Sequence, residues 1–147
     1  MHKVEIYIDG SCSGNPGPGG WAAVCELNGK KLASCGFVAE KTTNNRMELS
    51  GALGGIQALR RPCEVTLYTD SAYLITCAKH NDAWLTEASR SNSDLWIELI
   101  KAAKKGGHKI KFVKIKGHSG ERLNELADKL AKAQCVKAKH VLYKTGG

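Results

Sequence analysis

Four acidic side chains occupy positions from which a folded chain can bring them together. Asp9 and Asp70 each come directly after a run of strand-forming residues. Glu48 and Asp128 lie close to the apolar stripes of two predicted helices. If the two strands are parallel neighbours, both of their carboxylates emerge at the same edge of the sheet, where ligands bind in open α/β sheets. The four carboxylates are therefore candidates for one site.

Carboxylates that converge without a lysine or arginine between them repel one another, and their pKa values rise unless cations lie among them. Hard oxygen ligands favour Mg²⁺ or Mn²⁺ over zinc, and the cysteines of this chain offer no competing thiolate cluster. The spacing of the four residues leaves their convergence as one of several possibilities.

Each acidic residue also has a purely structural interpretation, in which it serves the local backbone or pairs on the surface. These alternatives are a turn at Asp9-Gly10, a cap by Asp70 on a helix starting at Ser71, a capping box of Asn45 with Glu48, and an i, i+4 pair of Asp128 with Lys132. The sequence pattern alone does not decide between the two interpretations.

The elements that would position these residues alternate along the chain. Strand patterns cover 4–8, 21–27, 31–38, 64–69 and 109–115, and helical spacing of apolar residues covers 49–59, 71–78, 94–104 and 123–131. Asn28-Gly29 predicts a hairpin, so the second and third strands are antiparallel. The glycine-rich stretch 10–20 is predicted to be turn or loop. Strands interleaved with helices in the second half indicate a mixed sheet covered by helices.

Length and composition favour one globular domain. The chain has 147 residues, 42% hydrophobic and 24% charged, which excludes a disordered tail, a collagenous chain and a coiled coil. No apolar run approaches the roughly 20 residues of a membrane span. Six cysteines without a CxxC pair indicate buried free thiols in a reducing compartment. We expect a single domain over 1–147, with a core of about 4–135 and a basic, loosely held C-terminal tail over 136–147.

The excess of positive charge lies in the C-terminal third. The formal net charge is +8, and residues 100–147 carry 13 basic and 3 acidic side chains. Such asymmetry points to a polyanionic partner, with nucleic acid the first candidate. A lysine-rich face that keeps the protein in solution is the alternative.

Five motifs resemble those of the type 1 ribonuclease H family, in the family's order and with near-family spacing. They are Tyr7–Ser11 with Gly14–Gly20, Thr42–Glu48, Thr69–Ser71, Lys116–Gly120, and Asn124-Glu125 with Ala127-Asp128. The resemblance runs from about Val4 to Ala133. It implies an α/β, ribonuclease H-like fold: a five-stranded mixed sheet, with strands one to three antiparallel and helices on both faces.

The resemblance also implies an activity. A family member would be an endonuclease that hydrolyses the RNA strand of RNA–DNA hybrids by two-metal-ion catalysis, leaving 5′-phosphate and 3′-hydroxyl ends. Asp9, Glu48, Asp70 and Asp128 match the four metal-binding, catalytic carboxylates, with two Mg²⁺ ions in the substrate complex and Mn²⁺ as a substitute. His118 matches the mobile histidine, for which we expect a catalytic role secondary to that of the carboxylates.

The residues expected to contact the hybrid include small polar side chains that can donate and accept hydrogen bonds in its minor groove. They are Cys12, Asn15, Thr43, Asn44, Asn45, Trp84 and Lys116. Further partners are not expected. The free thiols and the lack of an apolar span favour a cytoplasmic protein with no membrane partner, no obligate protein partner is evident, and a monomer is the default. The alternatives are a non-catalytic nucleic-acid-binding module on the same fold and a relative that cuts DNA.

The chain departs from many family members in two places. The long basic protrusion is absent or reduced, because 78–93 is short and holds few cations. Ala72 stands where many relatives have glutamine, which removes one base contact. We therefore expect hybrid binding to rely on the C-terminal basic set, including Lys104 and Lys105, with Trp84 lying against the DNA strand. The short segment 78–93 also resembles the corresponding part of the ribonuclease H domains attached to reverse transcriptases. We nevertheless favour an independent enzyme.

Overall fold

The structure of the chain is a computed structural model that describes residues 1–115 and 122–144. The strands are β1 His2–Cys12, β2 Gly17–Leu27, β3 Lys30–Thr42, β4 Cys63–Thr69 and β5 Lys109–Lys114. The helices are α1 Asn44–Gln57, α2 Ala72–Cys77, α3 Asp82–Leu85, α4 Ser93–Gly106 and α5 Arg122–Lys144. Lys116 and His118, two of the predicted site residues, lie outside the described residues.

The strands form one five-stranded sheet in the order β3-β2-β1-β4-β5. β1 pairs antiparallel with β2, and β2 pairs antiparallel with β3. β1 pairs in parallel with β4, and β4 in parallel with β5. The predicted mixed sheet with three antiparallel strands is therefore confirmed.

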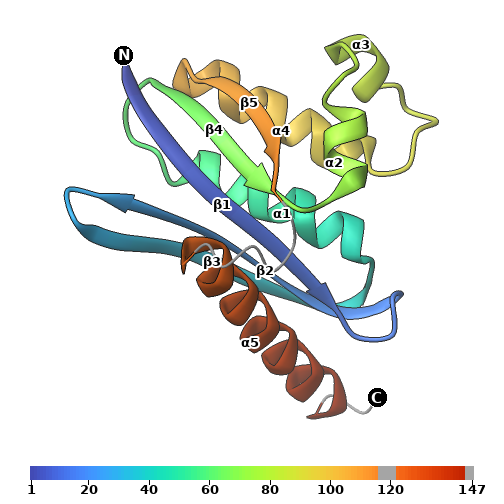
Figure 1. Cartoon of the computed structure of the whole chain (residues 1–147). Helices are drawn as coiled ribbons and strands as arrows, with labels where there is room; N and C mark the ends of the chain where they lie inside the picture. Colours follow the sequence, from blue (N-terminus) through green and yellow to red (C-terminus); the bar gives the residue numbers. More distant parts are fainter. Residues whose placement is uncertain (116–121, 145–147) are drawn as a thin grey trace.

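Helices cover both faces of this sheet, as Figure 1 shows for α1 and α5. Successive residues of a strand point to opposite faces, and two glycines of β2 show which helix lies on each. A Cβ on Gly19 would lie 2.7 Å from the Cγ of Met47 in α1, whereas a Cβ on Gly20 would lie 2.6 Å from the carbonyl oxygen of Ala131 in α5. The expected two-sided arrangement is confirmed.

The larger core lies between the sheet and α1, and α4 closes it. Its buried side chains include Val4, Ile6 and Ile8 of β1, Leu49, Ala52 and Ile56 of α1, Val65 and Leu67 of β4, and Trp96 and Leu99 of α4. The layer under α5 is made of small residues, among them Ala22, Ala127, Ala131 and Ala138. Large side chains thus hold α1 to the sheet, whereas α5 lies close to the strand backbone.

The prediction that residues 10–20 form only turn or loop is wrong. β1 continues to Cys12 and β2 begins at Gly17. The glycines in this stretch serve close packing, because a Cβ on Gly10 would lie 2.6 Å from the backbone nitrogen of Glu48. Glycine was therefore needed where two backbones approach each other, and the chain stays extended.

The prediction of a loosely held tail after Lys137 is also wrong as far as the structure describes it. α5 continues to Lys144, because Cys135 and Ala138 remain buried and extend the apolar side of the helix. Between α2 and α4 the chain forms only the short helix α3 and turns, as expected for a chain without a long basic protrusion. Within 1–115 and 122–144, no helix has the length and apolar character needed to cross a bilayer.

Candidate metal centre and substrate surface

Asp9 and Asp70 lie at the same end of two neighbouring parallel strands. In the register of β1 and β4, Tyr7 is opposite Tyr68, and each aspartate comes two residues later along its strand direction. The sequence left the convergence of these two carboxylates as one of several possibilities, and this parallel pairing brings it about. Asp70 stands just beyond the end of β4, while Asp9 still belongs to β1.

Glu48 reaches the same place from α1. It lies in the second turn of the helix, because α1 begins at Asn44, before the apolar spacing that predicted a helix from residue 49. The missing side chain of Gly10 lets the backbone of α1 at Glu48 come against β1 directly beside Asp9. One oxygen from each of Asp9, Glu48 and Asp70 lies within 4.8 Å of the others. The predicted cluster is therefore present for these three residues.

The three carboxylates differ in exposure. Asp9 is 7% exposed and Glu48 is 3% exposed, whereas Asp70 is exposed. The cluster therefore has a buried base and an open side formed by Asp70. A charged group that bridges these oxygens can reach them from solvent.

Burial and mutual repulsion disfavour the charged forms of this cluster. Burial, a hydrogen bond that the protonated Asp9 donates to Asp128, and the charge of Asp70 raise the pKa of Asp9 to about 7. Burial first, and then the charges of Asp9 and Asp70, raise the pKa of Glu48 well above its usual value. Without a cation, the cluster holds protons that free carboxylates release.

Asp128 lies at the edge of this cluster, on α5. Its side chain lies close enough to accept a hydrogen bond from the protonated form of Asp9, and its Oδ2 also lies 3.0 Å from the Nζ of Lys132. The surface pair considered as an alternative therefore forms, but it does not keep Asp128 away from Asp9. The side chain is 37% exposed, so it remains accessible from solvent.

The donor set fits a divalent cation. Glu48 Oε2 is the one buried side-chain oxygen or nitrogen of the described residues that has no hydrogen-bond partner. A buried oxygen without a partner is costly, and a bound cation would remove that cost. All the available atoms are carboxylate oxygens, the ligands that Mg²⁺ and Mn²⁺ prefer.

Neighbouring residues take over the capping roles that the acidic residues might have had. Ser71 is the N-cap of α2, and its Oγ accepts a hydrogen bond from the backbone of Leu74 at 3.2 Å. Thr43 is the N-cap of α1, with its Oγ1 accepting from the backbone of Arg46 at 3.2 Å. The proposed cap by Asp70 and the capping box starting at Asn45 are therefore both wrong.

The predicted hybrid-contacting residues of the first two motifs lie together, next to the carboxylates. Asn15 Oδ1 accepts a hydrogen bond from the backbone of Asn44 at 2.9 Å, which joins the loop after β1 to the start of α1. Cys12 lies within the same junction, where its thiol donates to the carbonyl oxygens of Gly17 and Thr42, each at 3.4 Å. Glu48 follows Asn44 by one helical turn, so this junction and the cluster form one surface.

Trp84 does not join this junction through a free ring face. His80 stacks on its ring with centroids 3.6 Å apart, and the Arg90 guanidinium carbon lies 3.4 Å from a ring centroid. Two groups this close to one indole must occupy opposite faces, since they would otherwise overlap. Stacking of Trp84 against a nucleic acid would require one of them to move.

One polar network near the site was not found from the sequence. Arg46 donates to both oxygens of Asp94 and to the side chain of Asn92, which in turn donates to the hydroxyl of Tyr73 at 3.0 Å. The network connects the starts of α1, α2 and α4. Only the charges of Arg46 and Asp94 were visible in the sequence, and 48 positions separate them.

Named relatives match nearly the whole chain. A profile of the family described as RNase H matches residues 1–136. A ribonuclease H of Caldanaerobacter subterraneus subsp. tengcongensis is 48% identical over 145 residues, covering 91% of this chain and 92% of the relative. A ribonuclease H of Brucella ovis is 46% identical, covering 99% of this chain and 97% of the relative. The solved structure of LC11-RNase H1 in complex with RNA/DNA hybrid has a TM-score of 0.73 at 23% identity, covering 92% and 99%.

Proposed function

The chain belongs to the ribonuclease H family, and from this premise we propose that it hydrolyses the RNA strand of RNA–DNA hybrids with two divalent cations. Enzymes of this family use divalent metals. The observation that carries the proposal is the cluster of Asp9, Glu48 and Asp70, with oxygens within 4.8 Å of one another. A non-catalytic binding module has no need for such a cluster, and its electrostatic cost argues against that alternative.

Asp9, Glu48, Asp70 and Asp128 are the residues that would hold the cations, which we propose to be Mg²⁺, with Mn²⁺ able to substitute for it. When bound, two such ions supply neutralisation of the scissile phosphate and an activated water for in-line attack. Glu48 and Asp9 anchor from the buried side, while Asp70 and Asp128 complete the solvent-facing side. Cleavage of this type leaves 5′-phosphate and 3′-hydroxyl ends.

The hybrid would be recognised along the junction next to the cluster. Asn44 and Asn45 stand at the start of α1, and the Asn15 side chain is fixed there by its hydrogen bond to Asn44. Small polar groups in this position suit the shallow minor groove, where RNA displays its 2′-hydroxyls. The hybrid found with LC11-RNase H1, a protein of similar fold, supports this choice of substrate. His118 and Lys116 lie outside the described residues. We include them, His118 as a catalytic residue and Lys116 as a hybrid contact, because they belong to the motif Lys116–Gly120.

We further propose that residues 1–147 act as one domain and as a monomer in the cytoplasm. All six cysteines are free thiols, which fits a reducing compartment.

The test is a cleavage assay on three labelled substrates: RNA–DNA hybrid, RNA duplex and DNA duplex, each with and without Mg²⁺. We expect cleavage of the RNA strand of the hybrid only, dependent on Mg²⁺, with 3′-hydroxyl ends that a polymerase can extend. Cleavage of DNA duplex would favour the DNA-cutting alternative. Hybrid that binds but remains intact at every divalent concentration would favour the non-catalytic one.

A further inference from the structure

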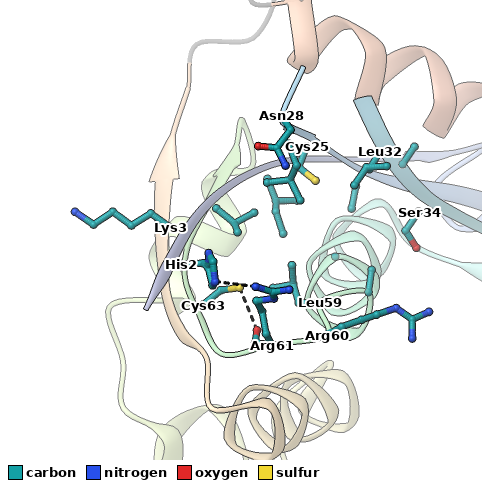
Figure 2. Close-up of a pocket in the computed structure, with 17 residues that line it drawn as sticks. His2, Lys3, Cys25, Asn28, Leu32, Ser34, Leu59, Arg60, Arg61 and Cys63 are labelled. Carbon is teal, nitrogen blue, oxygen red and sulfur yellow. Dashed lines mark hydrogen bonds between the residues drawn. The ribbon is translucent and has the colours of Figure 1, made fainter. Parts of the chain in front are cut away.

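A hollow of about 660 Å³ lies at the end of the sheet opposite to the carboxylate cluster. Figure 2 shows it between the strands β1, β2 and β3 and the C-terminal end of α1. His2 lines it and belongs to the start of β1, whereas Asp9 lies seven positions later in the same strand, roughly 23 Å along it. The hollow is therefore separate from the proposed catalytic site.

The hollow exists because small residues line both of its walls. Ala23, Cys25 and Ser34 face it from the strands, and Gly55 and Ala58 face it from the helix side. No side chain at these five positions is long enough to fill the space between α1 and the outer strands. The volume falls within the range of about 300–1,000 Å³ that is typical of small-molecule sites.

The interior is aliphatic. Ile6, Leu27, Leu32 and Leu59 line it, and Leu27 and Leu32 remain 38% and 48% exposed at the rim. No phenylalanine, tyrosine or tryptophan is among the lining residues. An apolar chain is therefore a better match than a nucleobase, which would need a ring to stack on.

The charge at the mouth is positive. The 17 lining residues include no acidic side chain. The Arg61 Nη1 lies 3.0 Å from Nε2 of His2, and Figure 2 shows the two side chains directed toward each other at the mouth, while Lys3 and Arg60 point away from it. Within the described part of the chain, none of the ion pairs includes Arg61. Its guanidinium therefore keeps donors for an anion.

We propose that this hollow binds an aliphatic carboxylate, with the apolar chain between β2 and α1 and the carboxylate on Arg61. Arginine binds carboxylates through two parallel hydrogen bonds, which fixes the head group at the mouth. A peptide is a poorer match, because its buried amides need hydrogen-bond partners and, besides His2 at the mouth, the lining offers only Asn28 and Ser34 as neutral amide or hydroxyl side chains.

Two cysteines of the chain give a built-in test. Cys25 lines the hollow, whereas Cys35 is opposite Ala22 and lies on the other face of the sheet, near Lys137 of α5. Both are partly exposed. Decanoate below its micellar concentration should slow alkylation of Cys25 by N-ethylmaleimide and leave that of Cys35 unchanged, as measured by peptide mass spectrometry. Burial raises the pKa of both thiols, so the reaction is run at mildly alkaline pH.

Matched variants separate the roles of charge and space. Arg61→Gln should raise the decanoate concentration needed for protection by about tenfold, because it removes a charge-assisted hydrogen bond. Arg60→Gln removes the same charge from a lining residue whose side chain points away from the mouth, and it should change nothing. Ser34→Leu should place a larger side chain inside the hollow and weaken protection, while hybrid cleavage and the circular dichroism spectrum show that the variant is folded.

Three results would overturn the proposal. One is equal protection of Cys25 and Cys35, which would indicate binding without a site. Another is equal protection of Cys25 by decyltrimethylammonium, which would exclude a role for Arg61. The third is no protection at any decanoate concentration. None of these results bears on hybrid cleavage, so the proposed function is tested separately.

Discussion

Arg46 and Asp94 form a two-pronged ion pair, with Nη1 and Nη2 donating to the two carboxylate oxygens at 2.9 and 2.8 Å. The pair joins the start of α1 to the start of α4. Its arginine precedes Glu48 by two positions in the sequence. Because Asp94 is 65% exposed, solvent screens much of the attraction. The pair therefore positions α1 more than it stabilises the fold.

Asp94→Asn should lower the free energy of unfolding by about 0.5–1 kcal/mol at neutral pH. The hydrogen bond from Arg46 lowers the pKa of Asp94, so its stabilising effect is fully present above the ordinary value near 4 and is lost as the pH falls through the lowered value. Urea denaturation at several pH values measures this. Glu98→Gln, which removes a charge from the same helix, is the control. A difference from wild type that persists at the lowest pH would contradict the prediction.

Asp70→Asn should reduce hybrid cleavage at least about a hundredfold, because it removes one ligand of the proposed cations. Stability without metal should not fall, since the change removes a negative charge that repels Asp9 and Glu48. Wild-type protein should melt at a higher temperature when Mg²⁺ is added, and the variant should show a smaller rise. Glu26→Gln, on the exposed end of β2, is the control. If Mg²⁺ raised the melting temperature of wild type and of Asp70→Asn equally, the cations would have to bind away from Asp70.

His118→Ala should lower turnover by less than Asp70→Asn does. The histidine is predicted to move protons or help product leave, whereas the carboxylates are predicted to hold the cations. Single-turnover and steady-state rates of both variants on the same hybrid give the comparison. Equal losses in the two variants would reverse this ranking.

Replacing Lys104 and Lys105 by glutamine should weaken hybrid binding and flatten its dependence on salt. Both side chains are exposed at the C-terminal turn of α4, and Lys104 lies 3.8 Å from Asp82. Each lost phosphate contact should reduce the slope of log K against log salt by about 0.9. Lys30 and Lys31, exposed at the start of β3, supply the matched double variant. An unchanged slope would exclude Lys104 and Lys105 from the interface.

Gly20→Ala should cost about 1–3 kcal/mol of stability and reduce cleavage. Its Cβ would lie 2.4 Å from the backbone nitrogen of Cys135, so α5 would have to move, and Asp128 moves with it. Gly29→Asn is the control, because the hairpin position has open space and a positive φ that asparagine tolerates. Urea denaturation and the cleavage rate are measured together. Wild-type stability in the Gly20 variant would show that α5 adjusts freely.

The order of strands and helices could be predicted from the sequence because apolar periodicity is local. The strands before Asp9 and Asp70 could be recognised from the sequence, but their parallel pairing was only a condition there, and the structure shows that it is met and that both carboxylates lie at one sheet edge. Glu48 and Asp128 were candidates from their places beside two apolar stripes, and the motif resemblance implied that they join the site, because their positions depend on how α1 and α5 pack. The roles of these residues in catalysis stay predictions.

The glycines show why other parts could not be predicted. A glycine in a sequence indicates either a turn or a close approach of another segment to the backbone. Only the residues packed against the glycine in the structure distinguish the two. Gly10 and Gly20 were assigned to a loop, but their partners are α1 and α5. Gly54 in α1 leaves room for the ring of Trp21, which a Cβ would meet at 2.3 Å. Close packing against the sheet side therefore explains this glycine within a helix.

The stack of His80 and Arg90 on Trp84 and the network around Arg46 depend on polar side chains. These side chains do not contribute to the apolar periodicity from which helices and strands are predicted. His80 and Arg90 were polar residues in a segment without a clear pattern, and they cover the two faces of one indole. Such arrangements depend on the turns between α2 and α4, which the sequence left undefined.

The unbroken course of α5 to Lys144 has a practical consequence for labelling experiments. A dye or spin label in place of Tyr143, which is 66% exposed, would be attached to a continuous helix rather than to an irregular tail. Its orientation would report directly on the sheet beneath Ala131 and Ala138. Distances from such a label to a hybrid could therefore be interpreted from one backbone position of residue 143 on the helix.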